Sequence, residues 1–211
     1  MSDSTFELKR LANYKTGPEA EHITNKHHVA YFKRIVNGFW KSKVINNNYF
    51  PGALPVSLEK RDFFKLKKYD YTVTAKTNGM RFFLLMTKHK DTDVFLMIDR
   101  GYSFYKVEGF NFDSEYHENT LFDGELINNK SGEWIYYIHD CVCYKGENIS
   151  KDKYFNRLHF AHEFVENTGY EDNDPFHIQT KPILNFSSES LRMIRDTEFD
   201  HSTDGLIFTP V

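Results

Sequence analysis

The stretch YTVTAKTNGMRFFLLM, residues 71–86, combines two runs of β-forming residues with a polar break between them. The first run alternates apolar and polar side chains, which predicts a strand, and Thr77-Asn78-Gly79 is typical of a tight turn. Lys76 comes directly before that turn. We therefore expect a hairpin that presents one lysine at the edge of a cleft, although such a stretch, taken alone, is more often a surface hairpin with a solvated lysine.

Further strand-like runs continue on the C-terminal side of this stretch. Short polar spacers separate them, which predicts antiparallel hairpins. The closing sequence STDGLIFTPV predicts one more strand after a turn. Together with the two runs of the opening stretch, Tyr71–Lys76 and Arg81–Thr87, the expected strands are Val94–Asp99, Ser103–Val107, Leu121–Asn128 and Trp134–Val142.

Helices are expected in three places. Apolar residues at helical spacing predict an amphipathic helix over 20–43 whose apolar stripe packs on a core. Ser150 is the expected N-cap of a second helix that ends at Asn167-Thr168-Gly169, and a shorter helix is expected near 187–196. The polar residues 1–20 predict a loose segment, and the prolines and glycine of YFPGALPVSLEK predict an extended, kinked one.

Composition narrows the class of protein. The chain has 211 residues, 40% of them hydrophobic, which is enough to form the core of one domain. It contains no run apolar enough to cross a bilayer and no signal peptide, so we expect an intracellular protein without a membrane partner. A net charge of −3 and a pI near 6.4 argue against a surface that coats nucleic acid, so any polynucleotide should be gripped locally.

The two cysteines and the histidines give little sign of a metal site. Cys141 and Cys143 are two apart in an expected strand, so they should share a face as buried, reduced thiols. A Cys-x-Cys pair can contribute to a metal site, but no second pair accompanies it, and we expect no structural zinc. The histidines share no spacing, and only His201 lies beside a motif.

Carboxylates occur at three informative positions. In LFDGELIN, Asp123 and Glu125 should share one face of a strand, and Gly124 permits close approach of another group. Asp140 lies in the apolar strand IYYIHDCV, where a buried carboxylate needs a metal, a cation or hydrogen bonds. Asp204 repeats the Asp-Gly theme in TDGLIFTP. Each Asp-Gly pair by itself is most often a turn.

Taken together and in order, these motifs resemble those of the covalent nucleotidyltransferases, the capping enzymes and polynucleotide ligases. The family signature is Lys-x-Asp-Gly followed by an arginine, which Lys76, Gly79 and Arg81 match, whereas Asn78 replaces the aspartate. FPGALPVSLEK and TDGLIFTP are similar to the mRNA guanylyltransferase forms of their motifs and unlike the ligase forms. The resemblance covers residues 50–211 and implies an α+β nucleotidyltransferase fold, two antiparallel sheets flanked by helices with the nucleotide between them.

The resemblance implies a catalytic lysine and a set of contacts with the sugar and the phosphates. Lys76 would attack the α-phosphate of GTP and hold GMP as a phosphoramidate, which a diphosphate-ended RNA then accepts. Glu125 would bind the ribose hydroxyls, and Arg81 and Arg100 would contact ribose or phosphate. Asp204 would help to hold the metal, Mg²⁺ or Mn²⁺, or the attacking lysine.

It also implies contacts with the base. Thr77 and Lys181 would read the polar edge of guanine, and Tyr137 would stack on the ring, although core packing is the commoner fate of residues in its strand. Gly79 would allow close backbone approach at the lysine turn. Asp140 is expected to give structural support.

The resemblance further implies domains and partners. Residues 1–49 would be an N-terminal polar segment and helix packed on a nucleotidyltransferase domain at 50–211. The family's next motif and its C-terminal OB-fold would follow Val211, so we expect a fragment of a larger capping enzyme. Expected partners are GTP, an RNA 5′ end and triphosphatase or methyltransferase domains, in the cytoplasm if the protein is viral and in the nucleus if it is cellular.

Two other functions stay open from the sequence. An ATP-dependent RNA or DNA ligase shares the lysine chemistry and differs in the nucleotide that labels Lys76. A catalytically silent nucleotide-binding domain is the other alternative, because Asn78 removes a charge from the signature.

Overall fold

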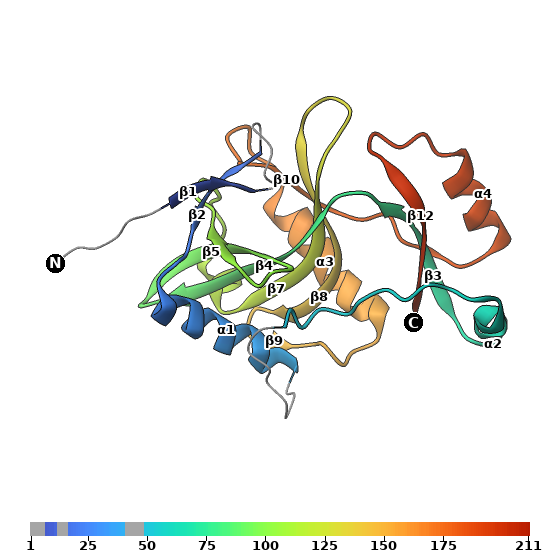
Figure 1. Cartoon of the computed structure of the whole chain (residues 1–211), viewed down its shortest axis with the longest axis horizontal. Coiled ribbons are helices and arrows are strands. Elements are labelled where there is room, and N and C mark those ends of the chain that lie inside the picture. Colours follow the sequence, from blue (N-terminus) through green and yellow to red (C-terminus); the bar gives the residue numbers. More distant parts are fainter. Residues whose placement is uncertain (1–6, 12–16, 41–48) are drawn as a thin grey trace.

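The computed structural model describes residues 7–11, 17–40 and 49–211, and in this part of the chain it has an α+β fold with two sheets. All strand pairs are antiparallel except that of β10 with β8, so the expected architecture of two essentially antiparallel sheets flanked by helices is confirmed (Figure 1). None of the helices in these ranges is long and apolar enough to span a membrane.

The larger sheet, which we call sheet A, has nine strands. Its order is β1-β2-β6-β5-β4-β7-β8-β10, and β9 pairs with β8. Long hairpins join β4 to β5 and β7 to β8, as the short polar spacers predict. The strands are β1 (Glu7–Arg10), β2 (Glu19–His22), β4 (Met80–His89), β5 (Thr92–Asp99), β6 (Phe104–Lys106), β7 (Thr120–Asn128), β8 (Trp134–Tyr144), β9 (Glu147–Asn148) and β10 (His177–Thr180).

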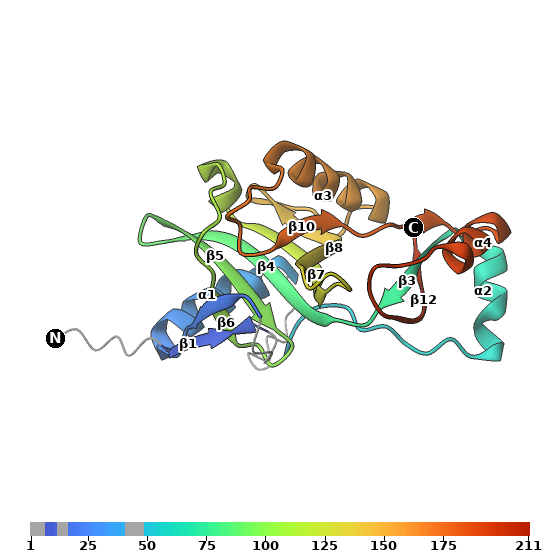
Figure 2. The same ribbon diagram turned by 90° about the horizontal axis from the view of Figure 1, so that it is seen from above.

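The smaller sheet, sheet B, has three strands in the order β11-β3-β12. They are β11 (Leu184–Asn185), β3 (Tyr71–Thr77) and β12 (Thr203–Pro210). Figure 2 shows sheet B as a separate lobe beyond the end of sheet A, with helices beside it. Every residue of β11 and β12 is exposed or half-buried, whereas five of the seven residues of β3 between them are buried, so sheet B is less covered than sheet A at its two edge strands.

Helices cover both faces of sheet A and one end of sheet B. They are α1 (Lys26–Trp40), α2 (Phe63–Lys68), α3 (Tyr154–Thr168) and α4 (Ser188–Asp196), with short 3₁₀ turns at Lys60–Asp62 and Ser114–His117. Ser187 caps α4 by accepting a hydrogen bond from the Ser190 amide, and Gly169, at φ 64°, ends α3. Figures 1 and 2 both place α2 and α4 at the sheet B end of the molecule.

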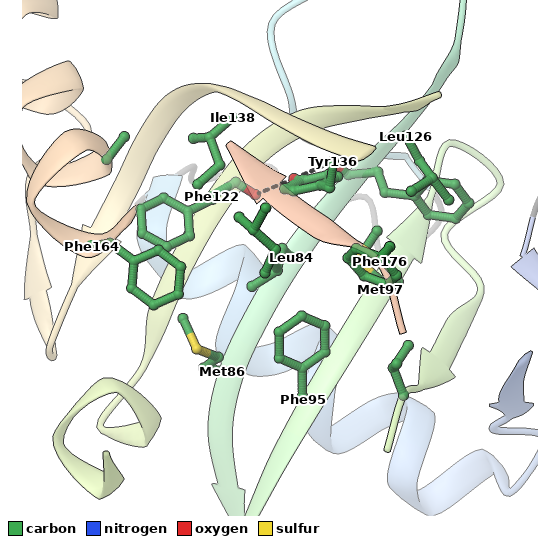
Figure 3. Packing of buried hydrophobic residues seen from close by; sticks show 14 of the residues in the cluster. Leu84, Met86, Phe95, Met97, Phe122, Leu126, Tyr136, Ile138, Phe164 and Phe176 are labelled. Atoms are coloured by element: carbon green, nitrogen blue, oxygen red, sulfur yellow. Dashed lines mark hydrogen bonds between the residues drawn. The ribbon is translucent and has the colours of Figure 1, made fainter. Parts of the chain in front are cut away.

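The apolar core divides between the two faces of sheet A. One cluster joins Phe122 and Tyr136 to Ala161 and Phe164 of α3, and Figure 3 shows its aromatic and aliphatic side chains interlocked over β4, β5 and β7. The Tyr136 hydroxyl satisfies its polar atom there by donating to the Phe82 carbonyl at 2.9 Å. A second cluster packs Phe32 and Val36 of α1 against the opposite face.

The lysine stretch departs from the expected hairpin. β3 belongs to sheet B and β4 to sheet A, and the two strands do not pair. Asn78 and Gly79 therefore carry the chain from one sheet to the other, and neither has a positive φ. The prediction failed because turn residues signal a change of direction but not the strand that the chain joins afterwards.

Other local predictions need correction at element boundaries. The expected helix over 20–43 begins only at Lys26, because Glu19–His22 forms β2 and Glu21 pairs with Lys106; residues 41–43 lie outside the described ranges. The N-terminal segment is not wholly loose, since Glu7–Arg10 pairs with β2 as strand β1.

Two side chains also differ from expectation. Ser150 does not cap α3, because the N-cap position of that helix is Lys153. The Ser150 hydroxyl instead donates a hydrogen bond to the side chain of Asn148. Cys141 and Cys143 are buried free thiols, but they belong to core clusters on opposite faces of sheet A. A register shift between β7 and β8 at this point breaks the two-residue alternation on which the same-face prediction depended.

Candidate functional site

Lys76 lies near the end of β3 in sheet B, where its amine meets a carboxylate from β12. Nζ donates to Oδ1 and Oδ2 of Asp204 at 2.5 and 2.7 Å. An irregularity in the β3–β12 pairing between Thr203 and Leu206 accompanies this contact. The Lys76 side chain is 41% exposed and that of Asp204 is 50% exposed, so the pair is open to a ligand. The structure thus brings together the expected nucleophile and its expected carboxylate.

Lys181, just after β10, supplies a second amine near the lysine. Its side chain is only 4% exposed, and Nζ lies 4.0 Å from Oε2 of Glu125. Burial lowers the pKa of Lys181, the charge of Glu125 opposes that change, and the charge of Lys76 adds to it. Residues from β3, β7 and the end of β10, which belong to both sheets, therefore share one electrostatic environment.

Arg81 is held by protein groups instead of pointing freely into solvent. Its Nε and Nη2 donate to the two oxygens of Asp123 at 2.8 and 2.5 Å, and Nη1 donates to the Ala53 carbonyl at 2.6 Å. Burial alone would lower the pKa of Arg81, but the bonds to Asp123 outweigh it and the pKa is raised. Burial would raise the pKa of Asp123, yet its pKa is lowered because the charge of His139 and the bonds from Arg81 overcome the cost of burial.

The proline-glycine segment before the lysine is tied to this arginine. The ring of Phe50 lies 5.2 Å from the Arg81 guanidinium carbon. A Cβ atom on Gly52 would lie 2.6 Å from Nη2 of Arg81 and 2.6 Å from the Phe50 ring. Only glycine fits between the ring and the guanidinium, which gives a physical reason for the FPG sequence.

Gly79 and Gly124 permit similar close contacts. A Cβ on Gly79 would meet the Ile127 side chain at 2.6 Å and the Leu126 carbonyl at 2.8 Å, and the Gly79 amide donates to Oε1 of Glu125 at 3.2 Å. A Cβ on Gly124 would lie 2.5 Å from the Tyr137 carbonyl. Both glycines therefore serve close approach, as the sequence predicts for these positions.

A cavity of about 410 Å³ opens where β4 begins and β5 ends. It brings together four of the predicted site residues, Gly79, Arg81, Arg100 and Glu125, whereas the other five are not part of its lining. Arg100 is exposed at the turn after β5.

Two cationic residues of β1 that sequence reasoning missed also line this cavity. They are Lys9 and Arg10, and Arg10 pairs with Glu19 at 2.9 Å. They come from a segment expected to be loose, about 70 residues before Arg81 in the chain. No local motif marks such a contact, and Glu7–Arg10 has neither the alternation nor the β-branched residues that would have indicated a strand.

Thr77 and Tyr137, the expected base contacts, lie around His201. Thr77 is buried with Oγ1 3.4 Å from Nε2 of His201, and the Tyr137 ring is 5.4 Å from the histidine ring. Nδ1 of His201 is 2.6 Å from Oδ1 of Asp200. Both ring nitrogens of His201 therefore have a polar partner within the protein.

No group of three or more His, Cys, Asp or Glu side chains within the described ranges is arranged to hold a metal ion. Asp204 is the predicted metal ligand, and its carboxylate is exposed beside Lys76. Mg²⁺ is commonly bound by one or two carboxylates together with substrate phosphates. Asp204 could serve as the single protein ligand in such a site.

Asp140 accepts hydrogen bonds from Nε and Nη2 of Arg157 at 2.7 and 3.0 Å. This carboxylate is therefore paired with a cation, as expected for a residue that supports the structure.

Comparison with known proteins gives consistent matches. The family described as mRNA capping enzyme, catalytic domain, matches residues 20–211. The chain is similar to mRNA-capping enzyme subunit alpha of Kluyveromyces lactis, with 32% identity over 78% of the chain and 41% of the relative. It is also similar to the protein of the same name from Saccharomyces cerevisiae, with 31% identity over 77% of the chain and 41% of the relative.

An animal protein matches as well. The mRNA-capping enzyme of Danio rerio is 29% identical over 77% of this chain and 30% of its own length. The chain therefore spans less than half the length of these relatives.

Proposed function

The chain belongs to the family of mRNA capping enzyme catalytic domains, and from that premise we propose that it is an mRNA guanylyltransferase. It would transfer GMP from GTP to a diphosphate RNA 5′ end through a covalent intermediate on Lys76. The observation that carries this proposal is the position of the lysine. Its half-exposed amine is bonded to Asp204 and shares an electrostatic environment with Lys181 and Glu125 from the other sheet.

The first step is attack on the nucleotide. The Lys76 amine gives up a proton, for which Asp204 is the bonded acceptor, and Nζ forms a bond to the α-phosphorus of GTP. The bond from that phosphorus to the bridging oxygen breaks, and pyrophosphate leaves with the electron pair. In the second step an oxygen of the RNA terminal phosphate attacks the same phosphorus, the P–N bond breaks, and the lysine recovers a proton.

The remaining residues would position the nucleotide. The carboxylate of Glu125 accepts a hydrogen bond from the Gly79 amide and lies 4.0 Å from Nζ of Lys181. These contacts leave it able to accept hydrogen bonds from the ribose hydroxyls. Arg100 is exposed at the cavity and would contact phosphate. Lys181 is a buried cation with a lowered pKa, suited to donate to the guanine carbonyl oxygen. Thr77 and Tyr137 would contact the base near His201.

Arg81 would act mainly through its neighbours. Its guanidinium is already bonded to Asp123 and to the Ala53 carbonyl, so it anchors the segment before β3 to sheet A. A divalent cation such as Mg²⁺ or Mn²⁺, held by Asp204 and the phosphates of GTP, would neutralise charge that develops on the leaving group.

Covalent labelling tests this function directly. The chain is incubated with GTP labelled at the α-phosphate, with Mg²⁺ or Mn²⁺, and is then denatured. We expect label that survives denaturation, that Lys76→Ala and Lys76→Arg both lose, and that GTP labelled at the γ-phosphate does not give. Addition of diphosphate-ended RNA should remove the label from the protein.

The same assay separates the alternatives. Label from ATP in preference to GTP would assign the chain to the ligases, and label that persists in Lys76→Ala would exclude Lys76 as the nucleophile. Asn78 is exposed, and among the residues that the structure describes only its backbone amide is engaged, with the Ser202 carbonyl at 2.9 Å. We expect Asn78→Asp to raise the initial labelling rate of an active chain. No label in the native chain with strong label in this variant would indicate a silent domain.

A further inference from the structure

A short segment before β3 has a composition unlike the rest of the chain. Residues 60–69, KRDFFKLKKY, contain five cationic side chains and one aspartate, a local charge of +4 in a protein whose net charge is −3. The rest of the chain therefore carries −7. Three aromatic residues, Phe63, Phe64 and Tyr69, are interleaved with these cations. We call residues 60–69 the basic-aromatic segment.

Its aromatic rings are exposed. Phe63, Phe64 and Tyr69 have 52%, 58% and 54% of their surface open to solvent. Leu66 is half-buried and marks the side of α2 that faces the protein. Water-exposed rings on three residues in a run of seven form an apolar surface that a folded domain does not need for its own core.

Helix geometry places the rings and the lysines on one side. Residues three or four apart are neighbours on a helix surface, so Lys67 lies beside Phe63 and Phe64, and Lys68 lies beside Phe64. Nζ of Lys68 is also 5.3 Å from the Tyr69 ring centre. Lys60, Lys67 and Lys68 have no carboxylate partner among the residues that the structure describes, whereas Lys65 is paired with Asp62.

We propose that the basic-aromatic segment binds single-stranded RNA next to the 5′ end that accepts GMP. Stacking of bases on exposed rings combined with neutralisation of phosphates by lysines is the usual chemistry of single-strand binding without sequence preference. Rings interleaved with cations match a partner in which bases and phosphates alternate along one strand. This inference rests on the proposed function for the identity of the RNA as an acceptor.

The position of the segment suits that task. α2 ends at Lys68, and β3 carries the chain from Tyr71 to Lys76. At about 3.3 Å per strand residue, Tyr69 at the near end of the segment lies within about 25 Å of the lysine along the chain. A few nucleotides span such a distance. None of residues 60–69 lines the cavity, and the hydrogen-bonding partner of Lys76 is Asp204, so the segment is separable from nucleotide attack.

Two pairs of variants test the proposal on the full 211-residue chain. Lys67→Glu with Lys68→Glu alters the charge, and Phe63→Ala with Phe64→Ala removes the rings. Matched controls at exposed positions elsewhere are Lys26→Glu with Lys151→Glu and Phe155→Ala with Tyr170→Ala. The probe is a fluorescent single-stranded RNA with a 5′ diphosphate, titrated at several salt concentrations.

The two variants should fail in different ways. Loss of two phosphate contacts should reduce the slope of log affinity against log salt by about 1.4 and weaken binding at low salt. Loss of the rings should weaken binding about tenfold and leave the slope unchanged. Both variants should form lysyl-GMP from GTP at the native rate and transfer it to RNA more slowly, and both controls should behave as the native chain.

Other outcomes overturn the inference. Native RNA affinity in both variants would do so, and an equal loss of lysyl-GMP formation would indicate a structural role for α2. A ring variant that changes only self-association, measured by sedimentation, would assign the surface to a second copy of the chain. If the native chain forms no lysyl-GMP, the proposed function fails, while the RNA titration still tests the segment by itself.

Discussion

Each sheet of this protein contains an arginine or lysine bonded through both oxygens of an aspartate, but the two ion pairs differ in their surroundings. In sheet A the side chains of Arg81 and Asp123 are 14% and 7% exposed. In sheet B those of Lys76 and Asp204 are 41% and 50% exposed. Similar bonding geometry therefore occurs once in a buried setting and once in solvent.

The difference in exposure indicates that one ion pair stabilises the structure and that the other is available to a ligand. A buried pair whose partner is removed leaves an uncompensated charge in a low-dielectric environment, so it fixes structure. An exposed pair is screened and contributes little to stability, so its partners are free to exchange for a ligand. Sheet A thus acts as a rigid support, and sheet B presents the amine.

Removal of the buried carboxylate should have the largest effect on folding. Asp123→Ala leaves the Arg81 guanidinium with only the Ala53 carbonyl as a hydrogen-bonded partner among the described residues. We expect the free energy of unfolding to fall by about 3–5 kcal/mol, measured by urea denaturation.

Glu115→Ala is the matched control, because Glu115 bonds Lys145 at an exposed site, and it should change stability little. The double variant Arg81→Met with Asp123→Leu should recover most of the loss, since it removes both charges. An Asp123→Ala protein as stable as the control would show that burial does not distinguish the two pairs.

A methyl group at Gly124 should have the next largest effect. This residue lies between Asp123 and Glu125 on β7, and a Cβ there would lie 2.5 Å from the Tyr137 carbonyl and from the Tyr136 ring. Gly124→Ala should therefore lower the free energy of unfolding by about 1–3 kcal/mol through overpacking.

Gly38→Ala provides the opposite control. Gly38 lies inside α1, and nothing is within 4 Å of its added Cβ, so this change should raise stability by about 0.5–1 kcal/mol. Equal effects of the two alanines would show that sheet A is not packed as tightly as its contacts indicate.

Sequence patterns could identify most of the strands but not their partners. The runs that became β4, β5, β7 and β8 have strong periodicity and short spacers, and they formed the expected hairpins. The lysine turn had the same local chemistry, yet it joins two sheets. The paired strands β3 and β12 are about 130 residues apart in the chain, and no local propensity predicts pairing over such a distance.

The candidate site shows the same limit. Lys76, Glu125 and Asp204 could be found because each lies in a short motif, and the structure brings their elements together. The bond between Arg81 and Asp123 required the register of β4 on β7, in which Phe83 lies opposite Asp123. Lys9 and Arg10 reach the cavity through β1, whose pairing depends on β2 and β6. Register and edge pairing are properties of the whole sheet.

Acid should act on the buried pair in a defined direction. The pKa of Asp123 is lowered in the folded protein, so its contribution to stability is fully present above the unfolded value of 3.8 and is lost as the pH falls through the folded value. We expect stability to fall on acidification below about pH 4 more steeply in the native chain than in Asp123→Asn. Parallel pH profiles in urea denaturation would contradict a charged Asp123.

Removal of the exposed carboxylate should have the smallest effect on folding and separates the two pairs most sharply. Asp204→Ala should cost at most about 1 kcal/mol in urea denaturation, because solvent screens its bond to Lys76. Covalent labelling from α-labelled GTP should nevertheless fall at least about tenfold, since the amine loses the carboxylate that orients it. Asp200→Ala, which removes an exposed carboxylate bonded to His201, is the control and should keep most of the labelling. If Asp204→Ala destabilised the protein as much as Asp123→Ala does, the exposed pair would be structural, and the division of work between the two sheets would be wrong.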